Sequence, residues 1–253
     1  MSSLVIVVNL LLVDRRRVVP AHVEILQMRV AVLNDIHGNL PALEAVLAEV
    51  RAAAVDRIVV GGDVLPGPMP CETMDVLLGL DQPVEFLYGN GEVRWNADQL
   101  TPPHKDLIAS WPMTLRLTIP PLGDVLFCHA TPRDWNECFV KTTAEEELLP
   151  IINAANAAIV VCGHTHMHFD RVVGKTRVIN AGSVGMPFGR TGADWLLLGE
   201  DVQLRHTSFD LDAAVTRFRR MGCPMTEEFI VPRILTPASE QWLDIFAGAD
   251  RGR

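Results

Sequence analysis

Short apolar runs that end in polar residues, most often beside glycine, constrain this chain most strongly. Five such ends occur along the sequence, and they read NDIHG, GGDV, GNGE, FCHA and CGHTH. The runs before them are short and rich in β-branched residues, which is typical of buried strands. In layered α/β folds, sites collect at the ends of strands. The pattern therefore predicts an α/β protein whose polar strand ends form a site.

Strands and helices alternate in the first part of the chain. Strands are expected at 29–34, 57–60 and 83–90, and helices at 41–53 and around 72–78. Within 41–53, Leu43, Val46, Leu47 and Val50 recur at helical spacing, and Pro41 suits a first turn. This alternation favours layered α/β packing with partly parallel strands.

The later part of the chain predicts more strands. Hairpins are expected over 113–130 and 169–180, the second turning at Gly174-Lys175, and single strands at 158–162, 194–198 and 202–209. Helices are expected from about Thr143, where Pro150 should shorten or kink the helix, and at 212–221 and 239–246. The sequence shows no repeat or linker, so residues 28–253 are expected to form one domain.

Residues 1–27 differ from the rest. The apolar stretch Leu4–Val13 is too short to span a bilayer, and Arg15–Arg17 follow it, whereas a secretory signal places its charges first. Met28 then opens a natural domain start. We expect residues 1–27 to be an N-terminal extension and a non-native start; an extra edge strand is the alternative. No membrane association is expected.

Composition limits the partners. The 253 residues carry 22 basic and 31 acidic side chains, for a net charge of −9. Such a surface repels nucleic-acid backbones, so stable nucleic-acid binding is not expected, although metal ions could hold a small anionic ester. The 5 cysteines show no CxxC spacing and are expected to be reduced, as in a cytoplasmic protein.

The donors at the strand ends suit a metal centre. In an extended segment, residues two apart point the same way, so Asp35 and His37 are expected to face one site, as are His164 and His166. Carboxylate, imidazole and amide donors without thiolate suit Mn²⁺, Fe or Zn²⁺. The set is too large for one ion and fits two ions about 3.5–4 Å apart. Its members are Asp35, His37, Asp63, Asn90, His129, His164 and His166.

These motifs, in this order from about Met28 to Gly189, resemble the calcineurin-like metallophosphoesterase superfamily. The stretches LNDIHGNLPALEAVL and VINAGSVGMP resemble its small bacterial phosphodiesterase-like branch. The resemblance implies a four-layer sandwich of two mixed β-sheets flanked by helices, with a dimetal site at one edge. The expected function is a metal-dependent phosphoesterase, and more specifically a phosphodiesterase.

The resemblance also implies roles for the donors. It assigns Asp35, His37, Asp63 and His166 to one ion and Asp63, Asn90, His129 and His164 to the other, with Asp63 bridging. A metal-bridging hydroxide is expected to attack phosphorus. Asp63, Asn90 and His129 are the expected catalytic residues, and Mn²⁺ the metal expected to support activity in vitro.

The sequence departs from the family pattern at Gly91, where many relatives carry a histidine that assists the leaving group; Glu92 follows it. Glycine cannot donate a proton, so we expect aryl diesters to be hydrolysed much better than alkyl ones. Asn90 and Arg133 are predicted to bind the phosphate, with a surface ion pair as the equal alternative for Arg133. His168 is expected at the rim of the site.

Three readings of function stay open at this point. A phosphodiesterase acting on a small phosphate ester is the leading one, and a phosphomonoesterase, including a nucleotide or protein phosphatase, is the alternative. A binding scaffold of the same fold that has lost turnover is the rival from another class. The complete donor set argues against the scaffold. The loop Asn180–Pro187 either shapes the wall of the site or is purely structural.

Overall fold

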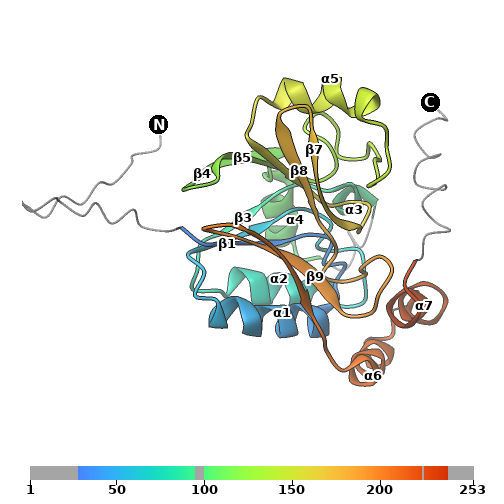
Figure 1. Ribbon diagram of the computed structural model, residues 1–253. Helices are drawn as coiled ribbons and strands as arrows, with labels where there is room; N and C mark the ends of the chain where they lie inside the picture. The colour runs from blue at the N-terminus through green and yellow to red at the C-terminus, as the bar shows by residue number, and fades with distance from the viewer. Residues whose placement is uncertain (1–27, 95–99, 224, 239–253) are drawn as a thin grey trace, which may run out of the picture.

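The computed structural model describes residues 28–94, 100–223 and 225–238, in which two five-stranded sheets pack together (Figure 1). The first sheet has the strand order β10-β9-β1-β2-β3. In it β1 and β3 run parallel to β2, whereas β9 is antiparallel to β1 and β10. Its strands are β1 (Val30–Leu33), β2 (Arg57–Val60), β3 (Val84–Phe86), β9 (Ala193–Leu198) and β10 (Val202–Thr207).

The second sheet has the order β4-β5-β6-β8-β7. Here β6 runs parallel to β5 and β8, while β4 and β7 are antiparallel edge strands. Both sheets are therefore mixed. The strands are β4 (Thr114–Ile119), β5 (Gly123–Cys128), β6 (Ile159–Cys162), β7 (His168–Val173) and β8 (Thr176–Ala181).

Strand β1 is apolar throughout because both of its faces are buried. Val30 and Val32 belong to the core between the two sheets, whereas Ala31 and Leu33 pack under helices on the outer face. Successive side chains of a strand point to opposite faces, so a strand covered on both faces must be apolar throughout.

Helices cover the outer faces of both sheets, as Figure 1 shows. Helix α1 (Leu40–Ala52) and helix α2 (Pro70–Leu78) pack on the first sheet, and α5 (Glu145–Ala155) packs on the second. Asn39 caps α1 by accepting a hydrogen bond from the Ala42 N–H at 3.2 Å. The layers helix, sheet, sheet and helix confirm the four-layer α/β sandwich that the resemblance implied.

Most predicted elements are confirmed, and the differences have physical causes. Both hairpins form, as β4–β5 and β7–β8. The expectation that Pro150 would shorten its helix is wrong, because α5 continues to Ala155. Burial of Leu148 and Ile152 against the second sheet offsets the single hydrogen bond that proline removes.

Several short elements were not predicted. They are α3 (Asn90–Arg94), α4 (Pro102–Ala109), the π-helix η1 (Thr226–Ile230) and α7 (Val231–Leu235). Helix α6 (Leu211–Met221) was predicted and forms. The expected helix at 239–246 and the expected extension at 1–27 lie outside the described residues.

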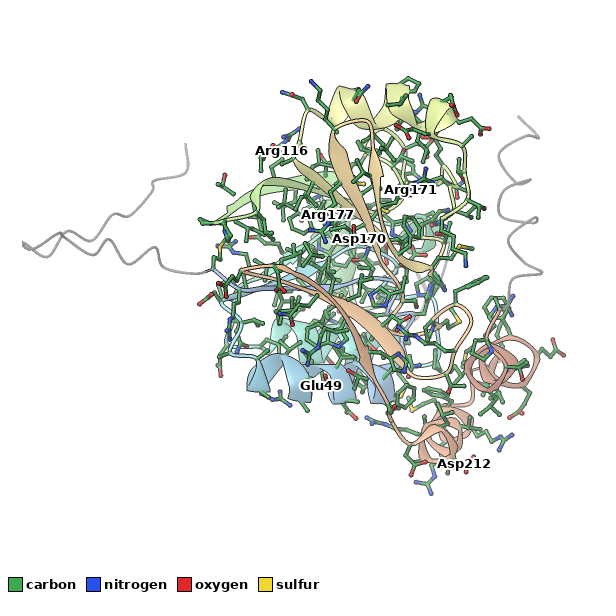
Figure 2. The ribbon with its side chains drawn as sticks, in the orientation of Figure 1. Glu49, Arg116, Asp170, Arg171, Arg177 and Asp212 are labelled. Carbon is green, nitrogen blue, oxygen red and sulfur yellow. The ribbon has the colours of Figure 1, made fainter. Side chains whose placement is uncertain are left out.

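Exposed ion pairs lie on the surface of the second sheet. Arg177 on β8 and Asp170 on β7 lie next to each other, with Nε donating to Oδ1 at 2.9 Å (Figure 2). Such exposed pairs add little stability, so the packed sheets supply most of it. Among the described residues, no helix has the length and apolar character needed to cross a membrane.

The packing between the sheets can be tested with a matched pair of valines. Val161 on β6 is 1% exposed within the inter-sheet core, whereas Val172 on β7 is 62% exposed. We expect Val161→Ala to lower the free energy of unfolding by about 2 kcal/mol, and Val172→Ala by less than about 0.5 kcal/mol. Urea unfolding followed by circular dichroism measures both. Equal losses would contradict the assignment of β6 to the core.

Candidate metal centre

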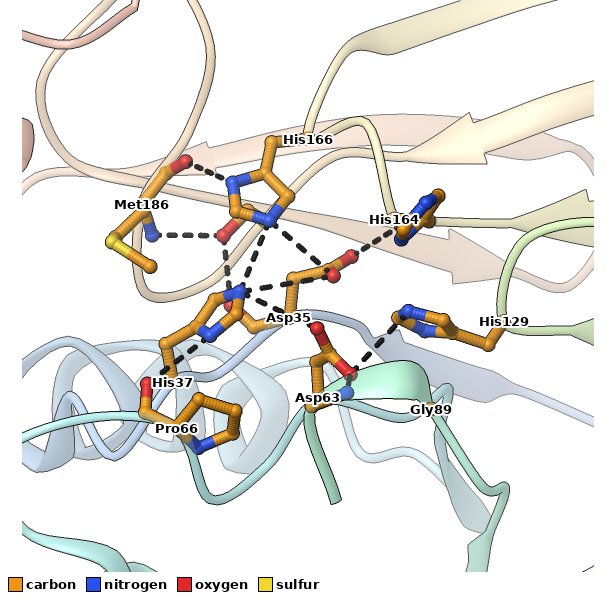
Figure 3. A network of polar contacts seen from close by, with 12 residues as sticks. Asp35, His37, Asp63, Pro66, Gly89, His129, His164, His166 and Met186 are labelled. Carbon is orange, nitrogen blue, oxygen red and sulfur yellow. Dashed lines mark hydrogen bonds and ion pairs between the residues drawn. The ribbon is translucent and has the colours of Figure 1, made fainter. Parts of the chain in front are cut away.

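The ends of parallel strands bring the predicted donors together, and Figure 3 shows all of them except Asn90 as labelled side chains. In the first sheet, Asp35 and His37 follow β1, Asp63 follows β2, and Asn90 follows β3 as the first residue of α3. In the second sheet the donors follow β5 and β6; they are His129, His164 and His166. Because the two sheets stack, both groups meet at one edge.

The backbone at this edge adopts a rare conformation. Positive φ angles of 52°, 52°, 52°, 65° and 59° occur at Asp35, His37, Asp63, His164 and His166. Left-handed backbone is uncommon for residues other than glycine and clusters at functional sites. Asp35 and His37 do face one site, as expected, but the expected reason, an extended segment, is wrong. Left-handed backbone at both residues, on either side of Ile36, turns the two side chains inward.

Gly163 is required for a close approach and not for its φ angle. A Cβ atom on Gly163 would lie 2.4 Å from both the Asn34 side chain and Asp35 Oδ2. Only glycine lets the turn after β6 pack directly on the turn after β1. The main-chain N–H of His164 then donates to Asp35 Oδ2 at 2.9 Å, which joins the two sheets at the site.

The Nε2 atoms of His37 and His166 face each other. Nδ1 of His37 lies 3.2 Å from the carbonyl oxygen of Pro66, and Nδ1 of His166 lies 2.7 Å from that of Met186. A carbonyl can only accept, so each Nδ1 carries the proton. In the neutral rings the two Nε2 atoms, 3.0 Å apart, are then both lone-pair acceptors. Such a contact is repulsive unless a cation lies between the rings.

Asp35 supplies an oxygen to the same cluster. Its Oδ1 is buried without a hydrogen-bond partner in the described structure, and it lies 3.4 Å from His166 Nε2 and 3.9 Å from His37 Nε2. A buried carboxylate oxygen without a donor is costly. A divalent cation held by Asp35, His37 and His166 satisfies all three acceptors at once, so these residues fit a metal ion.

Asp63 faces two clusters with its two oxygens. Oδ2 lies 3.9 Å from His37 Nε2, and Oδ1 lies 3.4 Å from His129 Nε2. His129 donates from Nδ1 to the Gly61 carbonyl at 2.9 Å, so its Nε2 is again the acceptor, 2.9 Å from Asn90 Oδ1. Asp35, Asp63 and His129 form a second group with metal-ligand spacing. The two oxygens of Asp63 thus face different histidines, and its bridging role stays a prediction.

His164 reaches the site through one nitrogen. Its Nε2 lies 3.1 Å from Cys138 Sγ, which leaves Nδ1 as the ring atom available to a cation. The rings of His164 and His129 meet edge to face at 5.1 Å, so His164 sits beside the second group. The structure thus brings all the predicted metal donors into one neighbourhood. Their individual roles stay predictions.

Burial sets the protonation of this cluster. Burial, and next the charge of His166, lowers the pKa of His37 to about 4. Burial, and next His129, lowers the pKa of His164 to about 4. For Asp35, burial opposes ionisation, but the nearby imidazoles, His166 first, hold its pKa below the usual range. Near pH 7 the site therefore holds neutral His37 and His164 and an ionised Asp35, which are forms that bind metal. Burial opposes protonation of His166 and His129, but the nearby carboxylates of Asp35 and Asp63 raise the pKa of both imidazoles, so a metal ion would compete with a proton there.

Glu92, for which the sequence predicts no role, supports the loop that carries Asp63. Its buried carboxylate accepts from the N–H groups of Asp63 at 2.9 Å, Val64 at 2.7 Å and Gly89 at 2.8 Å. Burial and then the charge of Asp63 raise the pKa of Glu92 to about 7, while the N–H donors oppose that rise. No local sequence signal marks this contact, since Glu92 reaches a different strand.

The loop Asn180–Pro187 is both structural and part of the wall. Ser183 donates its hydroxyl to the Asp35 carbonyl at 2.7 Å, and Asn39 donates to the Gly185 carbonyl at 2.8 Å. These bonds fix the Met186 carbonyl that orients His166. Gly185 and Met186 also line the cavity above the donors. The two alternatives for this loop therefore both apply.

A cavity of about 610 Å³ opens over the donors. His37, Asp63, Asn90, His164 and His166 line its base. This volume lies within the range of ligand pockets, about 300–1,000 Å³. The base therefore has room above it for a substrate.

Gly91 lies at the same base, and the structure explains why this position is glycine. A Cβ atom there would lie 2.3 Å from Pro66 Cγ and 2.8 Å from Asp63 Oδ1. Its N–H donates to that Asp63 oxygen at 2.6 Å. Pro66 thus occupies the space into which a side chain at position 91 would project.

Two other predicted site residues lie apart from the donors. Arg133 pairs with Glu137, its Nε donating at 3.0 Å, and lines a separate hollow. It is not among the residues described around the 610 Å³ cavity. His168 turns away and shares Asp194 and Arg190 as neighbours, at 3.6 Å and 3.0 Å from its Nδ1. Substrate contact by Arg133 remains a prediction.

Two mixed sheets with clustered carboxylate and imidazole donors at one edge define a metal-binding α/β protein. A family model described as the calcineurin-like phosphoesterase superfamily domain matches residues 28–200, and the chain belongs to this superfamily. Comparison with curated proteins found no match.

Solved structures share the fold. A metallophosphoesterase from Sphaerobacter thermophilus is 23% identical, with a TM-score of 0.66 over 83% of this chain and 99% of that one. A hypothetical protein from Pyrococcus horikoshii is 18% identical, with a TM-score of 0.68 over 82% and 98%. An archaeal phosphodiesterase, also 18% identical, gives 0.51 over 71% and 99%. At these identities the likeness establishes the fold.

Removal of the Glu92 carboxylate tests its role under the Asp63 loop. Glu92→Ala leaves three buried N–H groups without their acceptor, so we expect the free energy of unfolding to fall by about 3 kcal/mol. The control Glu146→Ala, at an exposed position in the first turn of α5, should cost less than about 1 kcal/mol. Urea unfolding of the metal-free proteins measures both. Similar losses would show that Glu92 is dispensable to the loop.

Proposed function

We propose that this chain is a phosphodiesterase that depends on two divalent metal ions and acts on a small phosphate ester. The observation that carries the proposal is the set of facing acceptors: the Nε2 atoms of His37 and His166 lie 3.0 Å apart beside the unpartnered Oδ1 of Asp35. Asp63 Oδ1 lies 3.4 Å from His129 Nε2, which places His129 beside the same group of acceptors. Membership of a phosphoesterase superfamily supplies the reaction class.

The chain's own residues would hold the metals and keep the donors in place. Asp35, His37, Asp63 and His166 are proposed for one ion, and Asp63, Asn90, His129 and His164 for the other. Bound divalent ions supply Lewis acidity, which stabilises phosphoryl charge and makes water a nucleophile at neutral pH. The Pro66, Gly61 and Met186 carbonyls fix three imidazole tautomers, and the Gly91 N–H holds the bridging oxygen of Asp63.

The cavity supports a diester with a good leaving group. Among the residues described around it, the acidic or imidazole side chains are all predicted metal donors, and these residues include no lysine, tyrosine or glutamate. Position 91 has no room for a histidine while Pro66 stays in place. A leaving group that needs a proton would therefore depart slowly.

A phosphomonoesterase is the second candidate, because the same donors serve both ester classes. The complete and inward-facing donor set speaks against a scaffold that has lost turnover. Mn²⁺, Fe and Zn²⁺ all suit carboxylate, imidazole and amide ligands, and we expect Mn²⁺ to support activity in vitro. The net charge of −9 favours a small ester over nucleic acid as partner. A cytoplasmic location remains an expectation from the cysteine pattern.

Since no acidic or imidazole side chain other than the predicted metal donors lines the described part of the cavity, the rate should depend strongly on the leaving group. With Mn²⁺ present, bis(p-nitrophenyl) phosphate should be hydrolysed at least about 100-fold faster than a dialkyl phosphate, beyond the difference in their uncatalysed rates. Initial rates by absorbance and by phosphorus NMR give the comparison. If both esters show the same enhancement over the uncatalysed reaction, another group supplies the proton.

The bridging role of Asp63 predicts a joint loss of metal and activity. Asp63→Asn should bind fewer ions per chain than the native protein and lose at least about 100-fold in kcat. Asp81→Asn, at an exposed residue that does not line the cavity, is the matched control and should change neither. Elemental analysis and diester hydrolysis supply the two readouts. Full activity of the Asp63 variant would refute the proposed centre.

A further inference from the structure

The segment after α6 forms the far wall of the cavity. Phe229 and Ile230 of η1 and Pro232 and Ile234 of α7 line it together with the donors at the base. Ile230 and Ile234 are each 4% exposed, so their outer surfaces pack into the first-sheet core and fix the segment in place. This wall lies beyond residues 28–200, the range that the family model matches. The C-terminal segment therefore forms this wall outside the range of that match.

Arg233 is the cationic side chain among the described residues of this wall. Its guanidinium lies over the Phe229 ring at 3.4 Å from the centroid, and Nη1 donates to the Phe229 carbonyl at 3.3 Å. Stacking and this hydrogen bond hold the group in a defined position. Arg233 is half-buried.

Arg233 also lacks the kind of partner that most arginines here have. Arg177, Arg217 and Arg219 each pair with a carboxylate. Within the part of the chain that the structure describes, no carboxylate pairs with Arg233. Most N–H groups of its guanidinium are thus available to an acceptor from outside. In a chain of net charge −9, an arginine held at a cavity wall without an acid is well placed to bind an anion.

We propose that this wall is the subsite for the organic group of the substrate, with Phe229 contacting a flat apolar ring and Arg233 binding an acidic group that the ring carries. The inference rests on the proposed function, since a phosphoryl group at the donors directs its organic group into the cavity. The substrate class is then a phosphate ester of an aromatic or heteroaromatic compound with a second anionic group. A volume of about 610 Å³ exceeds the space that a phosphate with small alkyl groups would fill.

Three phosphonates test the subsite by binding, without turnover. Methylphosphonate carries only the anchoring group, phenylphosphonate adds the ring, and 4-phosphonobenzoate adds a carboxylate to the ring. Calorimetry on Mn²⁺-loaded protein should show affinity rising at each step, by about 10-fold for the ring and about 10-fold for the carboxylate. Phe229→Ala should reduce the gain from the ring.

Variants of Arg233 separate its charge from its packing. Arg233→Met should abolish the gain from the carboxylate while leaving the binding of methylphosphonate within about 2-fold, and Arg233→Lys should restore part of that gain. Arg220→Met, at an exposed residue of α6 outside the cavity lining, is the matched control and should change none of the affinities. Circular dichroism and thermal melting check that every variant is folded.

The outcomes distinguish failure of the proposed subsite from failure of the proposed phosphoesterase function. Equal affinity for all three phosphonates would overturn the subsite and leave the phosphoesterase proposal intact. A carboxylate gain that survives in Arg233→Met would overturn the role of Arg233. Failure of the Mn²⁺-loaded native protein to bind any of the three would instead contradict the proposed function itself.

Discussion

Face-to-face packing of two mixed sheets is the constraint on which the site depends. Val32 of β1 and Val161 of β6 lie in one apolar core between the sheets, each 1% exposed. This packing places the carboxyl ends of β1, β2 and β3 over those of β5 and β6. Donors that are far apart in sequence, such as Asp35 and His164, therefore meet. The hydrogen bond from the His164 N–H to Asp35 then locks the two sheet edges together.

The meeting point carries strain and repulsion that a cation would relieve. Left-handed backbone at Asp35, His37 and Asp63 directs their side chains inward, at a cost of about 1–3 kcal/mol per residue. Carbonyl oxygens fix the protons of His37 and His166 on Nδ1, so lone pairs face each other across 3.0 Å. Folding energy from the sandwich sustains this arrangement. Metal binding is the interaction that turns these separate costs into one favourable site.

Much of this arrangement could be predicted from the sequence. A donor directly after an apolar β-branched run lies at a strand end, and this rule located Asp63 and His129. It could not supply the backbone conformation, because the left-handed angles of Asp35 and His37 depend on the Asp63 loop packed beside them. Glu92 was missed because two of its three partners, the N–H groups of Asp63 and Val64, lie on the loop after β2.

The cavity wall was missed for a related reason. The segment that holds Phe229 and Arg233 is short and carries no strong helical periodicity. Its relation to the donors arises only when η1 and α7 pack against the first sheet. Pro66, which fills the place opposite Gly91, is likewise visible only in three dimensions. Contacts of this kind depend on tertiary packing, which local patterns do not encode.

The proposed dinuclear centre requires that two cations share the Asp63 carboxylate at the edge where the sheets meet. Crystals grown with manganese, measured on both sides of the manganese absorption edge, locate such ions directly by anomalous scattering. We expect two peaks about 3.5–4 Å apart, one beside His37 and His166 and the other beside Asn90 and His129. A single peak, or peaks elsewhere in the molecule with this cluster empty, would contradict the dinuclear centre.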